Sequence, residues 1–211
     1  MRTLDQIRTR LDDVVRAISD AEVLDRVGDP LQRFVDQRLG SSDAGSVLRG
    51  EWLGHPLHPA LTDLPIGFWT SAWFLDFGGK RSRRAADVMV ALGVVSAAPT
   101  ALAGLADWAQ LDQRDRRLGV VHMAANVGAT LCYASSLAAR LRGQRVRGVA
   151  MSWAGATVAT AGAFLGGHLA FAGASTPGAE ADDVVDQRAA VLHAMDDAID
   201  GATAEPAVSG R

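Results

Sequence analysis

The sequence predicts an all-α protein, a four-helix transmembrane bundle flanked by short amphipathic helices. Three observations support this fold class: four long apolar runs, basic clusters in two of the connections between them, and acidic residues concentrated towards both ends of the chain. The average composition of the 211 residues, 48% apolar and 21% charged, is that of a small soluble domain. The prediction therefore depends on how the residues are distributed along the chain.

Four apolar stretches are long enough to cross a membrane, because about twenty helical residues span a hydrocarbon core of about 30 Å. They cover approximately residues 61–78, 85–109, 119–139 and 148–172. Gly162 and Gly166 lie four residues apart in the last stretch, and small residues at this spacing let helices approach closely. A soluble bundle of deeply buried helices is the alternative interpretation.

The charges of the connections predict the topology. The first and third connections contain basic residues and no acid: Lys80, Arg81, Arg83 and Arg84 in the first, and Arg140, Arg142, Arg145 and Arg147 in the third. The positive-inside rule places both connections in the cytoplasm. The second connection, 110–118, carries both signs. We therefore expect it, and both termini, on the outer side of a bacterial plasma membrane; an inverted multi-pass topology is the alternative.

The two ends of the chain predict amphipathic helices. Leu4, Ile7, Leu11, Val14 and Ile18 have heptad-like spacing. A second helix is expected up to Leu39, after a break near Gly28, Asp29 and Pro30. These helices are expected to pack on the membrane surface, with packing on each other or on a partner helix as alternatives. The chain thus divides into an amphipathic helical segment (1–50), a four-span module (51–175), and an acidic amphipathic helix with a disordered tail (176–211).

Six ionisable side chains are expected on one side of the membrane, because the alternating directions of the spans bring their positions together. They are His55, His58, His122, His168, Asp63 and Asp107. Ionisable groups in a bilayer are costly, so a convergent set of them indicates a functional site. The alternative is that the imidazoles only bond backbone carbonyl groups at the interface.

The motif His55-Pro56-Leu57-His58-Pro59 adds a local expectation. Each proline restricts the preceding residue to extended conformations. Three residues make one turn of polyproline helix, so the two imidazole rings are expected to point the same way. Pro59 is then the expected first residue of the first membrane helix.

The segment 52–67, WLGHPLHPALTDLPIG, resembles the signature of a bacterial membrane family called domain of unknown function 2231. Looser similarity follows in the right order at 104–108, which contains Asp107, at 122–126 and at 166–169, so that the resemblance covers approximately residues 48–173. It implies a four-helix membrane module whose biochemical activity is unassigned.

Some members of that family carry a Rieske iron-sulfur domain after the last span, which implies a role in electron transfer. A Rieske centre needs two cysteines and two histidines. After His168 this sequence contains no cysteine and only His193. The cluster domain is therefore not expected in these residues, and a redox role would depend on the bundle or on a separate partner.

Two functional hypotheses remain. In the first, the bundle is a redox module in which His58, His122 and His168 bind haem b, or bind a metal ion with Asp63 or Asp107, near the outer face. His55 is a fourth ligand or a supporting residue, Trp52, Trp69 and Trp108 provide interfacial packing, and a separate Rieske or cytochrome protein is the electron-transfer partner. In the second, the bundle is a structural or interaction module without a cofactor.

Other classes of function have little support. No nucleophile with an adjacent base and no phosphate-binding glycine loop is evident, so the chain is not expected to be an enzyme by itself. The short arginine clusters are explained by topology, so nucleic-acid binding is not expected. The lipid bilayer is the expected partner, and the oligomeric state stays open.

Overall fold

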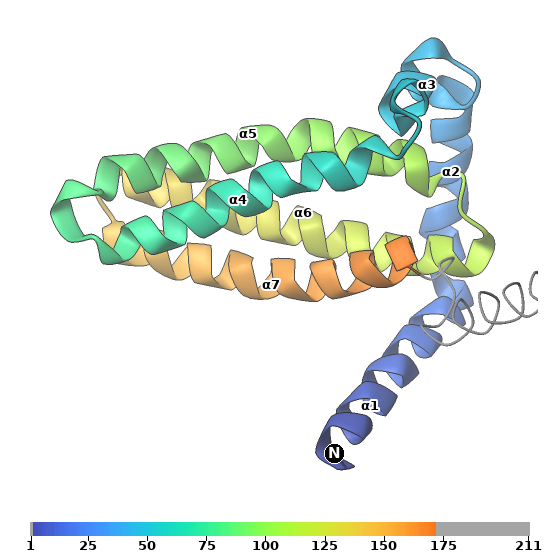
Figure 1. Ribbon diagram of the computed structural model, residues 1–211, viewed down its shortest axis with the longest axis horizontal. Coiled ribbons are helices and arrows are strands. Elements are labelled where there is room, and N and C mark those ends of the chain that lie inside the picture. Colours follow the sequence, from blue (N-terminus) through green and yellow to red (C-terminus); the bar gives the residue numbers. More distant parts are fainter. Residues whose placement is uncertain (1, 172–211) are drawn as a thin grey trace, which may run out of the picture. The chain divides into compact units, whose positions relative to one another are not determined.

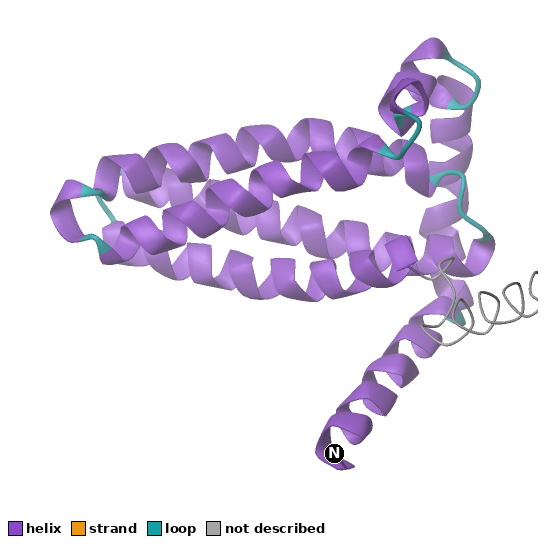
Figure 2. Ribbon diagram, viewed as in Figure 1, coloured by secondary structure: helices purple, strands orange, loops and turns teal. Residues whose placement is uncertain are grey.

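The computed structural model describes residues 2–171 (Figure 1). Within them the chain forms seven α-helices and three short 3-10 helices, without any strand (Figure 2). The prediction of an all-α fold is confirmed. Residues 1–169 form one compact unit. The acidic helix and disordered tail that the sequence predicts over 176–211 lie outside the described residues.

Four long helices form a bundle in which successive helices run in opposite directions (Figure 1). They are α4 (Leu57–Phe77), α5 (Arg83–Trp108), α6 (Gln113–Leu141) and α7 (Arg145–Phe171). Most extend beyond the predicted apolar stretches, because polar end turns are helical as well. The N-terminus of α6 shows this: Asp112 caps the helix by accepting hydrogen bonds from the backbone N–H groups of Arg114 and Asp115.

The start of α4 differs from the expected polyproline turn. The helix begins at Leu57, so His58 is helical, whereas His55 precedes the helix. Pro59 lies in the first turn, where its missing N–H group removes no helical hydrogen bond. The ring of His55 is exposed and contacts the carbonyl oxygen of Pro56, whereas His58 contacts α5. The prediction that the two rings point the same way is wrong.

Three helices precede the bundle: α1 (Arg2–Ser19), α2 (Asp25–Leu39) and α3 (Asp43–Arg49). The chain turns between α1 and α2 at residues 20–24, which include a 3-10 turn over Glu22–Leu24. The predicted break near Gly28, Asp29 and Pro30 is therefore wrong, since these residues lie inside α2. Gly28 is buried where α2 packs near Trp108 and Val120, and this packing outweighs the weak helix propensity of Gly-Asp-Pro.

An arginine at the start of α6 ties the N-terminal helices to the bundle. Arg117 donates from Nε and Nη2 to the two carboxylate oxygens of Asp25, at 2.8 and 2.6 Å. Its Nη1 donates to the carbonyl oxygen of Ser19 at 3.0 Å. The hydrogen bonds from Arg117 hold the pKa of Asp25 below its usual range. One side chain thus fixes the end of α1 and the start of α2 on α6.

The apolar face of α1 is only partly covered. Val15 and Ile18 pack with Leu118 of α6 and Leu165 of α7. Four other residues of the predicted heptad-like row are exposed: Leu4, Ile7, Leu11 and Val14. Contact of this exposed row with a membrane surface stays a prediction.

The hairpin of α4 and α5 and the hairpin of α6 and α7 bury corresponding positions. All three buried residues of α4 have a buried counterpart in α6, 64 residues further along: Pro65, Trp69 and Ala72 correspond to Ala129, Tyr133 and Ser136. All five buried residues of α7 correspond to buried residues of α5 at a shift of 62: Ala86, Val90, Gly93, Thr100 and Ala103 correspond to Gly148, Ser152, Gly155, Gly162 and Leu165. The bundle is therefore an internal parallel repeat.

The connections of the two hairpins agree with this repeat. Gly79 and Gly143, again 64 residues apart, have positive φ angles of 73° and 76°. Three equivalent pairs also meet across the bundle: His58 with His122, Trp69 with Tyr133, and Asp76 with Arg140. A residue that contacts its own equivalent lies close to a two-fold axis. We therefore infer a pseudo-two-fold axis that runs along the bundle between α4 and α6.

Glycines let the second helix of each hairpin approach the rings of the first. The indole of Trp69 covers Gly93, where a Cβ atom would overlap the ring. At the equivalent Gly155 a Cβ atom would lie 2.9 Å from Cε2 of Tyr133. The two rings then stack, with centroids 4.0 Å apart and planes within 6°. The centre of the bundle is therefore a stacked aromatic pair held between two glycines.

Gly93→Ala is expected to lower the free energy of unfolding by about 1–3 kcal/mol, because the added methyl group overlaps the buried ring of Trp69. Gly67→Ala is the matched control, since no heavy atom lies within 4 Å of a Cβ atom there. The control should be neutral or slightly stabilising. Thermal unfolding in mild detergent, followed by circular dichroism, measures both. Equal midpoints for the two variants would contradict this packing.

Candidate functional site

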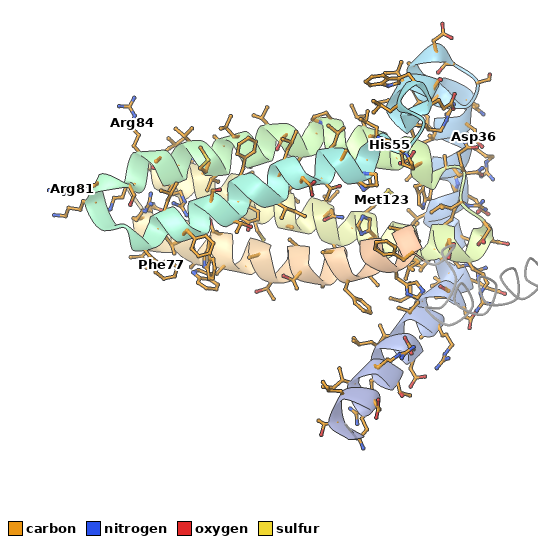
Figure 3. All side chains as sticks on the ribbon, in the orientation of Figure 1. Asp36, His55, Phe77, Arg81, Arg84 and Met123 are labelled. Carbon is orange, nitrogen blue, oxygen red and sulfur yellow. The ribbon has the colours of Figure 1, made fainter. Side chains whose placement is uncertain are left out.

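Two histidines face each other at the end of the bundle that carries α1 to α3. His58 lies in the first turn of α4, and His122 lies in α6 beside Met123, which Figure 3 labels at this end. The centroids of the two rings are 6.3 Å apart and their planes are perpendicular. Both side chains are partly buried. The repeat thus brings one imidazole from each hairpin to the axis.

Each imidazole is oriented by a backbone carbonyl group of the next helix. Nδ1 of His58 lies 2.9 Å from the carbonyl oxygen of Thr100, and Nδ1 of His122 lies 2.8 Å from that of Gly162. Thr100 and Gly162 are equivalent positions of the repeat. A carbonyl oxygen only accepts hydrogen bonds, so each Nδ1 carries the proton. Nε2 of each ring then carries the lone pair, which is free to accept a hydrogen bond or bind a metal.

Two equivalent glycines make room for these rings. A Cβ atom at Gly104 would lie 2.7 Å from Nδ1 of His58, and one at Gly166 would lie 2.6 Å from Cε1 of His122. Each glycine follows the carbonyl acceptor by four residues, so it lies one helical turn further on the same face. The small-residue spacing noted in the sequence therefore serves two purposes: close helix packing and seating of the imidazoles.

The environments of the two rings differ at Nε2. The amide nitrogen of Asn126 lies 3.0 Å from Nε2 of His122, one turn along α6. This contact agrees with the proton on Nδ1, because the amide can then donate to the free lone pair. The position equivalent to Asn126 in α4 is Thr62, which donates instead to the carbonyl oxygen of His58 at 2.8 Å. The site is therefore symmetric in its imidazoles and asymmetric around them.

The other predicted site residues do not join this pair. His55, His168 and Asp63 are exposed. Asp107 of α5 is partly buried and lies near His58. Within residues 2–171, no group of three or more His, Cys, Asp or Glu side chains is placed to hold a metal ion. The arrangement is an imidazole pair with one nearby carboxylate, rather than a layer of four histidines.

The tryptophans expected at the interface have different environments. Trp52 is exposed, as an interfacial residue would be. Trp69 is buried in the stack with Tyr133, so its assignment to the interface is wrong. Trp108 is also buried, and its Nε1 donates to the carbonyl oxygen of Arg116 at 2.9 Å. Trp69 is buried because it packs on Gly93 of the neighbouring helix. A hydropathy pattern does not show which glycine faces which ring, so the sequence did not reveal the burial of Trp69.

A second polar cluster, which the sequence analysis missed, lies at the opposite end of the bundle. The side chain of Arg140 is 0% exposed. Its Nη2 lies 2.6 Å from Oδ2 of Asp76, and its Nη1 lies 3.2 Å from Oδ1 of Asp87. Arg145 pairs with the same two carboxylates. The sequence had assigned Arg140 and Arg145 to a basic connection. The sequence feature that could have indicated their ion pairs is the presence of Asp76 and Asp87 in otherwise apolar stretches.

The guanidinium group of Arg140 is bonded on every nitrogen. Its Nε donates to Ser136 Oγ at 2.9 Å, and its Nη2 also donates to Ser152 Oγ at 3.1 Å. The ionic groups of this cluster, two arginines and two aspartates, come one from each of α4 to α7, and their charges cancel. Such a fully bonded neutral cluster is the form in which buried charges are tolerated. It ties the four helices together.

Large apolar side chains are exposed on all four helices of the bundle, whereas the His58–His122 and Asp76–Arg140 pairs lie inside it. This distribution is typical of membrane proteins. By length and composition, α5 and α7 could each cross a membrane. The family described as "Predicted membrane protein (DUF2231)" matches residues 54–177, more than half of the chain. The chain belongs to this family, as the resemblance of segment 52–67 had indicated. No curated protein and no solved structure matches the chain.

Arg140→Met is expected to lower the free energy of unfolding by about 3–5 kcal/mol, because it leaves Asp76 buried without its main partner. The double variant D76L/R140M removes both charges and should recover most of the loss. Arg16→Met is the matched control, since its ion pair with Asp13 is exposed on both sides. Unfolding in detergent measures all three. Similar midpoints for Arg140→Met and Arg16→Met would contradict a buried clamp.

Proposed function

We propose that α4 to α7 span a bacterial plasma membrane and hold a redox cofactor, haem b or a metal ion, between His58 and His122. The observation that carries the proposal is the imidazole pair, with each Nδ1 bonded to a carbonyl oxygen across a hairpin. The coarser conclusion, a membrane protein of the matched family, does not depend on it.

Four spans are favoured over two because α4 and α6 pack alongside α5 and α7. The polar residues that lower the apolar character of α4 and α6, such as Asp76, Asn126 and Arg140, have partners inside the bundle. Only 22% of the most apolar 18-residue stretch of α5 is buried, whereas the core helix of a soluble protein is mostly buried. Large apolar residues are exposed on all four helices, among them Phe74, Val95, Leu131 and Phe164. A hydrocarbon solvent accounts for these faces.

The topology follows from the two ends of the bundle. Arg81 and Arg84 extend from one end in Figure 3, while His55 and Met123 mark the other. The positive-inside rule places the arginine-rich end in the cytoplasm. The imidazole pair and helices α1 to α3 then lie on the outer side, with both termini.

The imidazole pair suits a metal-centred cofactor in two respects. Metal-ligating histidines commonly donate their second ring nitrogen to a carbonyl or carboxylate oxygen, as both rings do here. The two rings lie with centroids 6.3 Å apart, so one metal-centred group could be held by both. His58 and His122 would hold its metal through their Nε2 atoms.

The residues of the site have distinct tasks in this proposal. Thr100 and Gly162 hold the tautomer that leaves each Nε2 available, and Gly104 and Gly166 seat the rings. Binding at His122 requires the Asn126 amide to turn away from Nε2. A haem or redox metal, when bound, supplies one-electron transfer. The electron partner would be a separate Rieske or cytochrome protein that docks at the outer end.

The same contacts support a second candidate, a structural module without a cofactor. The bond from His58 to Thr100 joins α4 to α5, and the bond from His122 to Gly162 joins α6 to α7. Each imidazole would then only stabilise the packing of the two helices in its own hairpin. Loss of either histidine would lower stability and change no spectrum.

Optical spectra of the protein purified in mild detergent, oxidised and then reduced with dithionite, separate the two candidates. The redox proposal predicts haem bands or a stoichiometric metal. His58→Ala and His122→Ala should each bind at least tenfold less cofactor per protein than the unaltered chain, because each variant removes one of the two ligands. His55→Ala and His168→Ala are the matched controls and should retain it, since both side chains are exposed. A colourless, metal-free protein with normal helicity would support the structural module instead.

Cysteine labelling in intact cells tests the topology. In a Cys132→Ser background, Arg81→Cys should react with a membrane-impermeant thiol reagent only after lysis, because it lies at the arginine-rich end. Gln110→Cys, an exposed position in the connection between α5 and α6, should react in intact cells. The reverse pattern would show that the bundle is inserted in the opposite sense.

A further inference from the structure

The acids at the arginine-rich end are already neutralised. Asp76 and Asp87 are the carboxylates that α4 and α5 place at this end, and both pair with Arg140 and Arg145. This internal cluster has as many positive as negative groups. It therefore cannot balance the charges of the basic residues that surround it.

Six further basic residues surround this cluster, and all are exposed. They are Lys80, Arg81, Arg83, Arg84, Arg142 and Arg147, which are named here the cationic rim. Among the described residues, none of them lies within ion-pair distance of a carboxylate. The first turns of α5 and α7 contain no acid either. The positive ends of two helix dipoles thus add to the field of the rim.

The rim is distributed on both sides of the pseudo-two-fold axis. Its members come from the α4–α5 connection and the first turn of α5, and from the α6–α7 connection and the first turn of α7. Gly79 and Gly143 of the two connections are equivalent. The first residues of α5 and α7, Arg83 and Arg145, are equivalent as well. An anion near the axis at this end therefore meets cations from both hairpins.

Large apolar side chains lie next to these cations along the chain. Phe77 is 71% exposed, Leu141 is 76% exposed and Val146 is 86% exposed. Phe77 ends α4, Leu141 ends α6, and Val146 is in the first turn of α7, so all three are at the level of the rim. Figure 3 shows Phe77 at the same end as Arg81 and Arg84. A partner of this surface must therefore offer negative oxygen atoms beside hydrocarbon.

We propose that the cationic rim binds the headgroups of anionic phospholipids, with their acyl chains on Phe77, Leu141 and Val146. Clusters of four to eight Lys or Arg residues directly on the cytoplasmic side of a membrane helix are typical of anionic-lipid binding. A nucleic acid supplies the charge but not the hydrocarbon, and a protein segment would have to displace the lipid already present at this level. The bilayer supplies both at this depth. This inference rests on the proposed membrane insertion of α4 to α7 and does not depend on a cofactor at the imidazole pair.

Lipid titration of the purified full-length protein tests the proposal. The protein in zwitterionic detergent is titrated with phosphatidylglycerol or with phosphatidylcholine of the same chain length, and bound lipid is counted by native mass spectrometry. Phosphatidylglycerol should bind at least tenfold more tightly, and the difference should shrink as salt is added. Equal affinities for the two lipids would overturn the proposal.

A charge-matched pair of variants shows whether the rim is the site. R84Q/R147Q removes one rim cation from each hairpin and should weaken phosphatidylglycerol binding by about fivefold per residue. R10Q/R26Q removes the same charge from exposed positions of α1 and α2 and should bind as the unaltered protein does. Helicity should be normal in both, since all four residues are exposed. Equal weakening by both variants would mean diffuse attraction to net charge and would overturn a defined site.

Inorganic phosphate distinguishes a lipid site from a site for a free anion. At millimolar concentration it should displace little phosphatidylglycerol, because it makes no contact with the apolar side chains of the rim. Full displacement would show that hydrocarbon has no part in binding. The proposal of a lipid site would then be wrong.

Discussion

The close approach of paired helices over glycines is the constraint on which the rest of this bundle depends. In each hairpin a ring of the first helix lies directly on a glycine of the second, as His58 lies on Gly104 and Tyr133 on Gly155. Only at this distance does Nδ1 of the imidazole reach the carbonyl oxygen of Thr100. A larger residue at these glycines would separate the helices and turn the rings away, so that packing and site geometry have one cause.

The repeat also explains how the two hairpins recognise each other. At the level of the imidazoles the equivalent residues are identical, whereas at the other end they are Asp76 and Arg140. Two copies of the first hairpin would bring Asp76 against Asp76 and leave two like charges buried. The complementary pair therefore specifies association of unlike hairpins. The cost of burying the Asp76–Arg140 pair is offset by the hydrogen bonds of Arg140 to Ser136 and Ser152 and by the second ion pair of Asp76, with Arg145.

The two ends of the bundle are suited to different environments. At one end Arg117 holds α1 and α2 beside the imidazole pair, which gives that end a polar covering. The other end has no covering helix among the described residues and carries the cationic rim next to exposed apolar side chains. Under the proposed function a redox partner would approach the first end, and under the proposed lipid site headgroups would meet the second.

The sequence by itself determined the helical class, the family, the positions of the four long helices and the sharing of one end by His58 and His122. These depend on local composition, on helix length and on alternating direction, which are readable along the chain. It could not determine which histidines converge, the burial of Trp69, or the pairing of Arg140 with Asp76. The tertiary structure decided these features, because they depend on which helices face each other and on the glycines that lie opposite the rings. The hydropathy of the sequence contains neither kind of information.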